Sequence, residues 1–456
     1  MKPLKYFSFF IFSTFFYSTG FCQNWFPVGG GMSFFTPDTC VMSLHTDTAS
    51  GFLYAGGQFS MAGATSAKNI ARWNGTTWAA LGLGIDSAEQ FAVPTVYAIT
   101  KYNGDIYAAG YFYKAGSTPA NYIARWDGTN WYPLGSGLSG GVLGLEGARC
   151  LSVYNGELYV GGNFTTAGGN SVGGCIAKWN GTGWSQVGAG IGFNGFYVNA
   201  LAVYNGELYA GGMFTTVDGM PAKYIAKWNG SNWSAADSIS SVVNALCVYN
   251  GELYAGGDFG SPGIRICKWN GTDWFPVGTG MDDRVSSLCV YNNELYSGGI
   301  FTNAGGNSAN YIAKWNGSAW SAVGLGMCCP ITAFPSVDAL AVYSNQIYAG
   351  GWFFQAGTNT CYKIATWPSP VGIEDYNNEL DNLIIFPNPS NGVFDIESSL
   401  EIIYLNIFNV LGENIFEYKQ PSRTISIDIS DSPIGVYLVN FETEQGVIRK
   451  TIIISK

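Results

Sequence analysis

The feature of this sequence that most limits its possible folds is a unit of about fifty residues that occurs seven times between Trp25 and Trp367. The best-preserved copy, VNALAVYNGELYAGGMFTTVDGMPAKYIAKWNGSNW, runs from Val198 to Trp233. One tyrosine of the unit recurs at Tyr54, Tyr107, Tyr159, Tyr209, Tyr254, Tyr296 and Tyr348. One tryptophan recurs at Trp73, Trp126, Trp179, Trp228, Trp269, Trp315 and Trp367. Repeats of this length that are rich in short β-segments predict a radial or stacked β architecture.

Each unit divides into four predicted strands. In the best copy the first two strands flank Asn205-Gly206, and Asn-Gly between apolar runs is the strongest short signal for a hairpin. A loop rich in glycine and polar residues leads to a third strand that ends at Trp228, and a second Asn-Gly turn leads to a fourth strand around Trp233. Apolar residues at successive positions predict sheets that are covered on both faces. We therefore expect an all-β protein with a seven-bladed β-propeller.

The N-terminal segment predicts how such a ring closes. Residues Asn24–Met32 read NWFPVGGGM, which matches the fourth-strand text DWFPVGTGM of Asp273–Met281. The seventh unit stops at Trp367-Pro368 without a fourth strand of its own. We expect the N-terminal strand to complete the last blade and so remove an exposed sheet edge. An open solenoid is the alternative, and it requires polar capping repeats that the sequence does not show.

The run VYNGELYAGG, with its glycine doublet and a later tryptophan, resembles the kelch repeat of β-propellers over residues 25–367. The resemblance implies a propeller that most often binds other proteins, whereas a secreted minority of the family are copper oxidases. This chain departs from the kelch pattern in its third strand, where Trp-Asn-Gly replaces tyrosine-aspartate.

The two ends of the chain predict export. Residues 1–22 have Lys2 and Lys5 before a short apolar stretch that ends in small residues, which is typical of a signal peptide. We expect the propeller over residues 24–368, a linker over 369–380 and a small β-sandwich over 381–456. No other stretch approaches the length of a transmembrane helix, so we expect no transmembrane segment.

The segment 381–456 closely resembles the C-terminal sorting domain of the type IX secretion system of Bacteroidetes. The residues that carry this resemblance are Pro387, Asn388, Pro389, Gly392, Gly412, Gly435, Tyr437, Arg449 and Lys450. The resemblance implies that the type IX secretion machinery is a partner of the tail. It also implies that the protein is secreted or held at the outer cell surface.

Charge excludes one class of partner. The chain has 31 acidic and 21 basic residues and a formal net charge of −10, so we expect no binding to nucleic acid. Six of the seven residues before the third-strand tryptophan are basic, as in Arg125 and Lys178. The second strands begin with acids such as Asp105 and Glu157, so we expect structural ion pairs directly across the sheet.

The residue inventory argues against an enzyme, and we expect no cofactor and no metal. His45 is the only histidine, whereas the copper chemistry of kelch-like oxidases needs two histidine ligands. No Gly-x-Ser-x-Gly turn marks a nucleophile, and no cysteine and histidine cluster has zinc spacing. A glycan-active enzyme that uses paired carboxylates remains a minor alternative, because several acids lie in or near the predicted loops: Asp86, Glu89, Glu146, Asp282, Asp283 and Asp338.

Binding is the expected function, through the face that carries the long loops, because variable loops on a rigid scaffold are where recognition resides. Near the start of the first strands the repeats align Cys40, Tyr97, Arg149, Asn199, Asn244, Ser286 and Asp338. We predict ligand contacts from Arg149, Asn199, Asn244, Asp338, Phe196 and Tyr197. Carbohydrate or an extended protein segment suits aromatic and amide groups of this kind. Two alternatives stay open: these residues hydrogen-bond one another, or the protein is a structural or adhesive surface protein without a specific ligand.

Cysteines near the loops predict disulfides, which an exported protein can form. Loops that enter or belong to the last blade contain Cys328, Cys329 and Cys361. We expect Cys361 to pair with Cys328 or Cys329, and the remaining one of these two to reach Cys40.

Overall fold

The computed structural model describes residues 24–33, 39–87, 93–142, 146–192, 196–329, 335–368, 383–409, 413–443 and 446–455. The chain divides into two compact units, Met1–Ser369 and Pro370–Lys456. The predicted signal peptide, the predicted linker over 369–380 and Gly412 lie outside the described residues. In the described part of the chain the regular elements are all strands, so the all-β prediction is confirmed.

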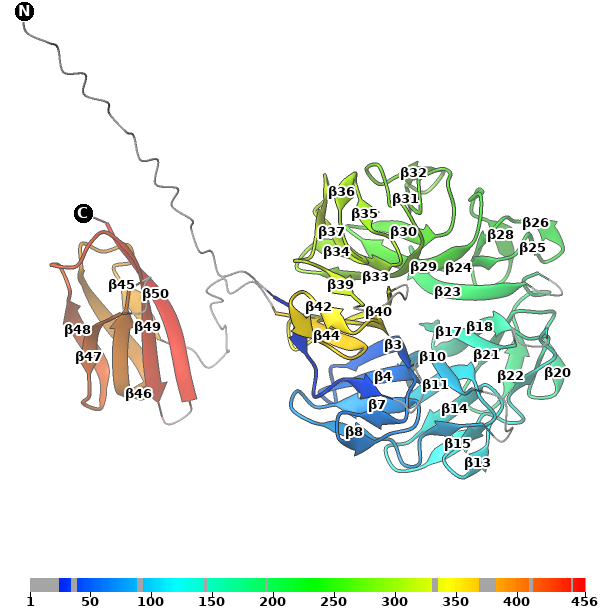
Figure 1. The fold of residues 1–456 in the computed structure, drawn as a ribbon, viewed down its shortest axis with the longest axis horizontal. Coiled ribbons are helices and arrows are strands. Elements are labelled where there is room, and N and C mark those ends of the chain that lie inside the picture. Colours follow the sequence, from blue (N-terminus) through cyan, green and yellow to red (C-terminus); the bar gives the residue numbers. More distant parts are fainter. Residues whose placement is uncertain are drawn as a thin grey trace, which may run out of the picture. The chain divides into compact units, whose positions relative to one another are not determined.

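The larger unit contains, within the described residues, seven four-stranded antiparallel sheets, one for each repeat (Figure 1). The first strands are β3 (Cys40–Asp47), β10 (Thr95–Tyr102), β17 (Gly147–Tyr154), β23 (Tyr197–Tyr204), β29 (Val243–Tyr249), β33 (Val285–Tyr291) and β40 (Ser336–Tyr343). The second strands are β4 (Phe52–Gln58), β11 (Asp105–Tyr111), β18 (Glu157–Asn163), β24 (Glu207–Met213), β30 (Glu252–Gly257), β34 (Glu294–Gly299) and β41 (Gln346–Trp352).

The outer half of each sheet is shorter. The third strands are β7 (Ile70–Trp73), β14 (Ile123–Trp126), β21 (Ile176–Trp179), β27 (Ile225–Trp228), β31 (Ile266–Trp269), β37 (Ile312–Trp315) and β44 (Ile364–Trp367). The fourth strands are β8 (Trp78–Ala80), β15 (Trp131–Pro133), β22 (Trp184–Gln186), β28 (Trp233–Ala235), β32 (Trp274–Pro276), β38 (Trp320–Ala322) and, for the last sheet, β1 (Phe26–Pro27).

Short strand pairs in the loops accompany the seven sheets. Three-stranded groups are β2 (Met32–Ser33) with β5 (Met61–Ala62) and β6 (Thr65–Ser66), β9 (Ile85–Asp86) with β12 (Lys114–Ala115) and β13 (Thr118–Pro119), β16 (Leu138–Ser139) with β19 (Thr166–Ala167) and β20 (Asn170–Ser171), and β39 (Met327–Cys328) with β42 (Gln355–Ala356) and β43 (Asn359–Thr360). Two-stranded groups are β25 (Thr216–Val217) with β26 (Met220–Pro221) and β35 (Asn303–Ala304) with β36 (Asn307–Ser308).

The N-terminal strand takes the place that the sequence predicts for it. Strand β1 pairs antiparallel with β44, with Phe26 opposite Thr366. Trp25 is fully buried, and its indole Nε1 donates to the carbonyl of Val323 at 3.0 Å. The fourth-strand tryptophans of the other six sheets donate in the same way to the preceding repeat, as Trp78 does to Val28 at 3.2 Å. The segment therefore acts as the fourth strand that the seventh repeat lacks.

The seventh sheet also contacts the first. The Tyr343 hydroxyl donates to the Gly51 carbonyl at 3.0 Å, and the Thr46 hydroxyl donates to the Val342 carbonyl at 2.7 Å. Tyr343 belongs to one buried cluster with residues of the first sheet. Strand-one tyrosines form the equivalent bond between other neighbouring sheets, as Tyr154 does with the Gly206 carbonyl at 2.9 Å. Figure 1 shows the first strands of all seven sheets around a common centre.

Ion pairs join the second and third strands, but not directly across the ladder. Lys178 lies opposite Tyr159 in the register, and its Nζ reaches Glu157 diagonally at 2.7 Å. Equivalent pairs at 2.7–2.9 Å link Asp105 to Arg125, Glu207 to Lys227, Glu252 to Lys268 and Glu294 to Lys314. The prediction of structural ion pairs is confirmed. The expected pairing directly across the ladder was wrong, because each acid lies two residues from the position opposite its basic partner, which is the next side chain on the same face of the sheet.

The smaller unit is built around one long strand. Its strands are β45 (Ile384–Phe386), β46 (Val393–Phe408), β47 (Asn414–Tyr418), β48 (Ser422–Asp428), β49 (Gly435–Thr443) and β50 (Gly446–Ile454). The first half of β46 pairs with β45 and β48, and its second half pairs with β47 and β49. A break in register between Glu397 and Ile402 separates the halves. Strand β46 therefore pairs with four other strands of the unit, and apolar residues such as Phe394 and Leu405 fill the core.

Candidate functional site

A β-bulge occurs at the same place in every first strand of the larger unit. In the fourth sheet Val198 lies opposite Gly212 and Ala200 lies opposite Gly211, so Asn199 has no partner across the ladder. A bulge leaves its extra residue unpaired and redirects that side chain. The equivalent residues, called here the bulge row, are Met42, Tyr97, Arg149, Asn199, Asn244, Ser286 and Asp338.

The bulge row corrects one position of the sequence alignment. The sequence alignment predicts Cys40 in this row, but the structure pairs Cys40 with Gln58 and places the bulge between Val41 and Ser43. Met42 is therefore the member from the first sheet. The turn of the first hairpin has four residues between Asp47 and Phe52, whereas the same turn in the other sheets has two, so the first strand is displaced in an alignment counted from the second strand.

The hairpin registers decide which loops accompany the bulge row. In the fourth sheet Tyr197 lies opposite Met213, whereas the turn end pairs Tyr204 with Glu207. The loops that enter the first strands and those that leave the second strands therefore share one end of each sheet. Both Asn-Gly turns lie at the other end, because Trp228 pairs with Trp233 there. The bulge row lies near the long-loop end, as predicted.

Arg149 stacks between two tyrosines from neighbouring sheets. Its guanidinium carbon lies 4.5 Å from the ring centre of Tyr197 and 5.8 Å from that of Tyr97. Burial raises the pKa of the Tyr97 hydroxyl, which the neighbouring arginine opposes. The Nε of Arg149 is buried and has no hydrogen-bond acceptor among the described residues. The structure thus brings Arg149 and Tyr197 together, as the predicted site requires.

The two asparagines of the row contact each other across neighbouring sheets. Asn199 Nδ2 donates to Asn244 Oδ1 at 2.9 Å, and Asn244 Nδ2 donates to Asp258 at 3.0 Å. This chain of bonds fixes both amide groups, so it agrees in part with the alternative that the row's polar groups bond one another. Asn199 Oδ1 stays available, because no described group donates to it.

Asp338 and Phe196 are held differently from the other predicted residues. Ser336 donates to the Asp338 carboxylate at 2.6 Å. Burial raises the pKa of Asp338, and the Ser336 bond and the charge of Arg284 lower it by smaller amounts. Phe196 packs against the buried cluster of the fourth sheet, and its carbonyl accepts a bond from Asn163 at 2.5 Å. Phe196 therefore supports the loop next to Tyr197.

Sequence reasoning missed two aromatic groups near the long-loop end. Each third strand is preceded by a residue with positive φ, between 56° and 68°, although none of these residues is glycine: Asn69, Tyr122, Cys175, Tyr224, Arg265, Tyr311 and Lys363. Tyr122 packs with Tyr113 and Tyr111 at ring distances of 5.1 and 6.1 Å. Lys363 lies over Phe354, 3.7 Å from the ring centre, and over Trp352. Trp352 was a possible signal, since it is the only tryptophan outside the repeated pattern.

Asp86, Asp282 and His45 lie in different parts of the larger unit, each with its own local contacts. Asp86 pairs with Lys68 at 2.6 Å. Burial alone would raise the pKa of Asp282, but hydrogen bonds from Asn303 and Thr302 hold it at about 2. His45 faces Tyr54 in the first sheet, and burial lowers its pKa. Glu89 lies outside the described residues. No group of three histidine, cysteine, aspartate or glutamate side chains in the described ranges is placed to hold a metal ion.

No disulfide joins any two of the nine cysteines in the described part of the chain. The structure therefore contains neither the predicted bond of Cys361 to Cys328 or Cys329 nor one to Cys40. Cys361 is fully buried in the core that the seventh sheet shares with the sixth, whereas Cys328 is exposed. The sequence predicts a loop position for Cys361, whereas the structure places it in the core. This position separates Cys361 from an exposed partner.

These thiols give a direct test. Because burial raises the pKa of Cys361 to about 11 and removes it from solvent, we expect an alkylating reagent to leave it unmodified in the folded protein at pH 8. Cys328 serves as the internal control and is expected to be modified within the same reaction. Peptide mass mapping under non-reducing conditions reads both sites. A disulfide-linked Cys361 peptide, or rapid alkylation at Cys361, would contradict the buried free thiol.

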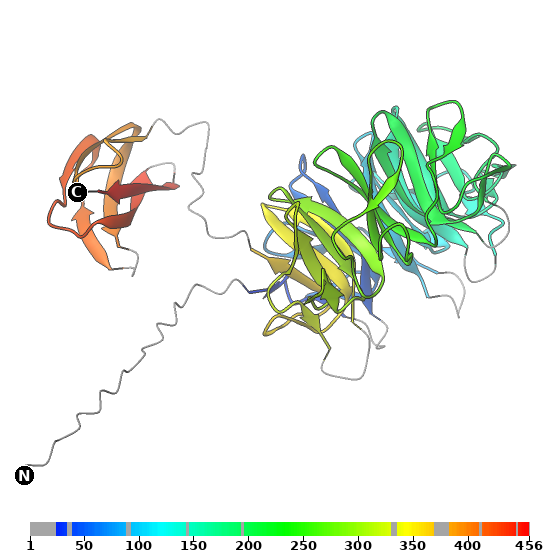
Figure 2. The same ribbon diagram turned by 90° about the horizontal axis from the view of Figure 1, so that it is seen from above.

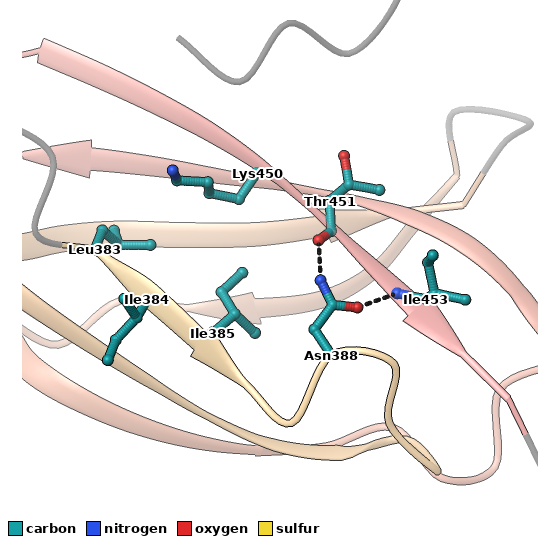
Figure 3. Close-up of a pocket in the computed structure, with 7 residues that line it drawn as sticks. All are labelled: Leu383, Ile384, Ile385, Asn388, Lys450, Thr451 and Ile453. Atoms are coloured by element: carbon teal, nitrogen blue, oxygen red, sulfur yellow. Dashed lines mark hydrogen bonds between the residues drawn. The ribbon is translucent and has the colours of Figure 1, made fainter. Parts of the chain in front are cut away.

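In the smaller unit the Pro387-Asn388-Pro389 motif bonds the last strand. Asn388 Nδ2 donates to the Thr451 carbonyl at 2.8 Å, and its Oδ1 accepts from the Ile453 amide at 2.9 Å (Figure 3). One side-chain amide therefore takes the place of a neighbouring strand along β50. A pocket of about 380 Å³ lies beside this motif and is lined by Leu383, Ile384, Ile385, Asn388, Lys450, Thr451 and Ile453 (Figure 3).

The remaining residues of the motif have local roles. Gly392 has φ of 102°, and a side chain there would meet the Ser430 backbone at 2.5 Å. The Tyr437 hydroxyl donates to the Pro433 carbonyl at 2.7 Å, and Gly435 begins β49. Arg449 lies in β50 opposite Asn440. Figure 2 shows the strands of this unit from a second direction.

Comparison with known proteins identifies the tail. A family model described as a secretion system C-terminal sorting domain matches residues 384–455. The match confirms the predicted type IX sorting domain and shows that the protein is secreted or lies at the cell surface. Among curated proteins none matches this sequence. No helix in the described ranges is long and apolar enough to cross a membrane.

Solved structures to which this chain is similar include two of the extracellular domain of BT4673 from B. thetaiotaomicron. One is described as a one-component system, with 12% identity over 95% of this chain and 58% of that chain and a TM-score of 0.45. The other is described as a hybrid two-component system, with 12% identity over 95% and 59% and a TM-score of 0.49. PorZ, a surface component of the type-IX secretion system of Porphyromonas gingivalis, has 14% identity over 91% and 66% and a TM-score of 0.38. This chain spans less than two thirds of each of these proteins.

Proposed function

We propose that this chain is an exported binding protein. In this proposal residues 24–368 form a kelch-like, seven-bladed β-propeller that is closed by the N-terminal strand, and the long-loop end of the propeller binds carbohydrate or protein. Residues 381–456 direct the chain to the type IX secretion machinery, and residues 1–22 are the signal peptide.

Three contacts support the closed propeller. Strand β1 completes the seventh sheet, Trp25 repeats the indole bond of the other fourth strands, and Tyr343 bonds the first sheet at Gly51. A closed ring leaves no long unpaired sheet edge, which favours a soluble exported protein. The kelch assignment rests on the hairpin, the glycine doublet and the tryptophan of each repeat.

The observation that carries the binding proposal is the bulge row. The same β-bulge recurs in all seven first strands, and in each strand it leaves one residue without a partner across the ladder. Bulges are over-represented next to functional sites. The row varies in chemistry from Met42 to Arg149 and Asp338, whereas the positions on either side of it repeat as valine or alanine before the bulge and alanine, serine or cysteine after it. Variation on a constant scaffold is the pattern expected of a recognition surface.

The site is tested by a double substitution in the full exported protein. A screen of immobilised glycans and extracellular proteins first supplies a ligand. We expect Arg149→Ala with Asp338→Ala to weaken binding at least tenfold, because two charged groups of the bulge row are removed. The melting temperature is measured in parallel to show that the sheets remain folded.

The matched control replaces Ser231 and Asn232 by alanine. Both residues are exposed in the turn between β27 and β28, at the opposite end of the same sheets. Affinity is expected to stay unchanged in this control. Full affinity in the Arg149 and Asp338 variant would place the site elsewhere, and a screen without any ligand would favour a structural or adhesive surface protein.

A further inference from the structure

We propose that the ligand of the bulge row is a saccharide that carries an acidic group, a carboxylate or a sulfate, and that Arg149 binds this group. The inference rests on the proposed binding function and specifies its ligand. It comes from the state of Arg149, which has no acidic partner among the described residues and lies between two tyrosines.

Basic residues in the middle of the sheets are mostly neutralised. Four lysines and Arg125 in the third strands each have an acidic partner at 2.7–2.9 Å. Arg149 has no ion pair and no hydrogen bond with any described residue, although its Nε is buried. Arg72 is also half-buried without an ion pair, but it lies over one aromatic ring, that of Phe52, whereas Arg149 lies between two tyrosines.

The two tyrosines hold the guanidinium in place. Tyr197 and Tyr97 come from the sheets on either side of Arg149, at 4.5 and 5.8 Å from its guanidinium carbon. Stacking on aromatic faces orients the planar group without using its N–H donors. The terminal Nη nitrogens are not among the buried atoms that lack a partner, so they reach solvent. A fork of free donors in a fixed orientation matches the two oxygens of a carboxylate or sulfate.

Neighbouring amides favour a saccharide over a simple anion. Asn199 is held by Asn244 and keeps Oδ1 as an acceptor for a hydroxyl group. The same strand presents Tyr197 beside it. An acidic group on a saccharide accepts hydrogen bonds from the Arg149 guanidinium, and a hydroxyl group on the ring beside it donates to Asn199 Oδ1.

The test uses the full exported protein and matched ligands. A panel of oligosaccharides that contain uronic acids or sulfate esters is titrated by calorimetry, and the uronic acid members are also tested as methyl esters. We expect binding of at least one acidic member, with affinity at least tenfold lower for its methyl ester or for its desulfated form. Arg149→Met is expected to reduce affinity for the acidic form to that of the neutral form.

Arg149→Lys and Arg284→Met separate the possible outcomes. The lysine variant retains charge without the planar fork and is expected to bind at least threefold more weakly. Arg284→Met changes another cation at the same end of the sheets and is expected to have little effect. Equal affinity for acidic and neutral forms, binding of a protein C-terminal carboxylate alone, or no binding by the panel overturns the inference. A neutral glycan that is lost in the Arg149 and Asp338 double variant would overturn it while leaving the proposed function intact.

Discussion

Deletion of Asn24–Met32 is expected to lower the thermal stability of the larger unit sharply. The segment supplies β1, buries Trp25 completely and provides an acceptor for Asn359, whose Nδ2 donates to the Trp25 carbonyl at 2.6 Å. Its loss exposes the edge of β44 and opens the core between the sixth and seventh sheets. Calorimetry or far-UV circular dichroism of the full chain without these nine residues measures the effect.

Point variants in the same segment make this test quantitative. Trp25→Ala is expected to cost about 3–5 kcal/mol of unfolding free energy, because it empties a fully buried site. Phe26→Ala is the matched control, since Phe26 is 48% exposed on the same strand, and its effect should stay within about 0.5 kcal/mol. An unchanged melting temperature in the deletion variant would refute the borrowed strand.

Removal of Asp381–Lys456 is expected to stop export while leaving the larger unit folded. The tail carries the sorting domain, and its hydrophobic core is made only of residues from the smaller unit. The seven sheets therefore lose no buried contact from their own clusters. Cell fractionation with immunoblotting should find the truncated chain in the periplasm and only background amounts outside the cell.

Two companion proteins distinguish sorting from folding. Fusion of residues 381–456 to a periplasmic reporter is expected to move that reporter outside the cell. The full chain with Arg149→Ala, altered only in the larger unit, is expected to be exported at the normal level. Normal amounts of the truncated protein outside the cell would contradict the sorting assignment.

Local patterns determined the repeated architecture of this protein. Asn-Gly turns require positive φ at defined positions, and Asn205 and Gly206 have φ of 48° and 77°. The apolar runs on either side of this turn then predict the hairpin that β23 and β24 form. The borrowed strand was also predictable, because the text of Asn24–Met32 copies a fourth strand and the last repeat lacks one. Each of these signals lies within a few neighbouring residues.

The tertiary structure determined which residues form the bulge row and what they contact. Whether Met42 or Cys40 belongs to it depends on a bulge, and a bulge is a property of two paired strands that one strand's sequence does not reveal. The partners of Arg149 come from two other repeats, and the burial of Cys361 depends on a neighbouring sheet. Contacts between repeats arise only when the sheets pack, because residues fifty positions apart have no local pattern that joins them.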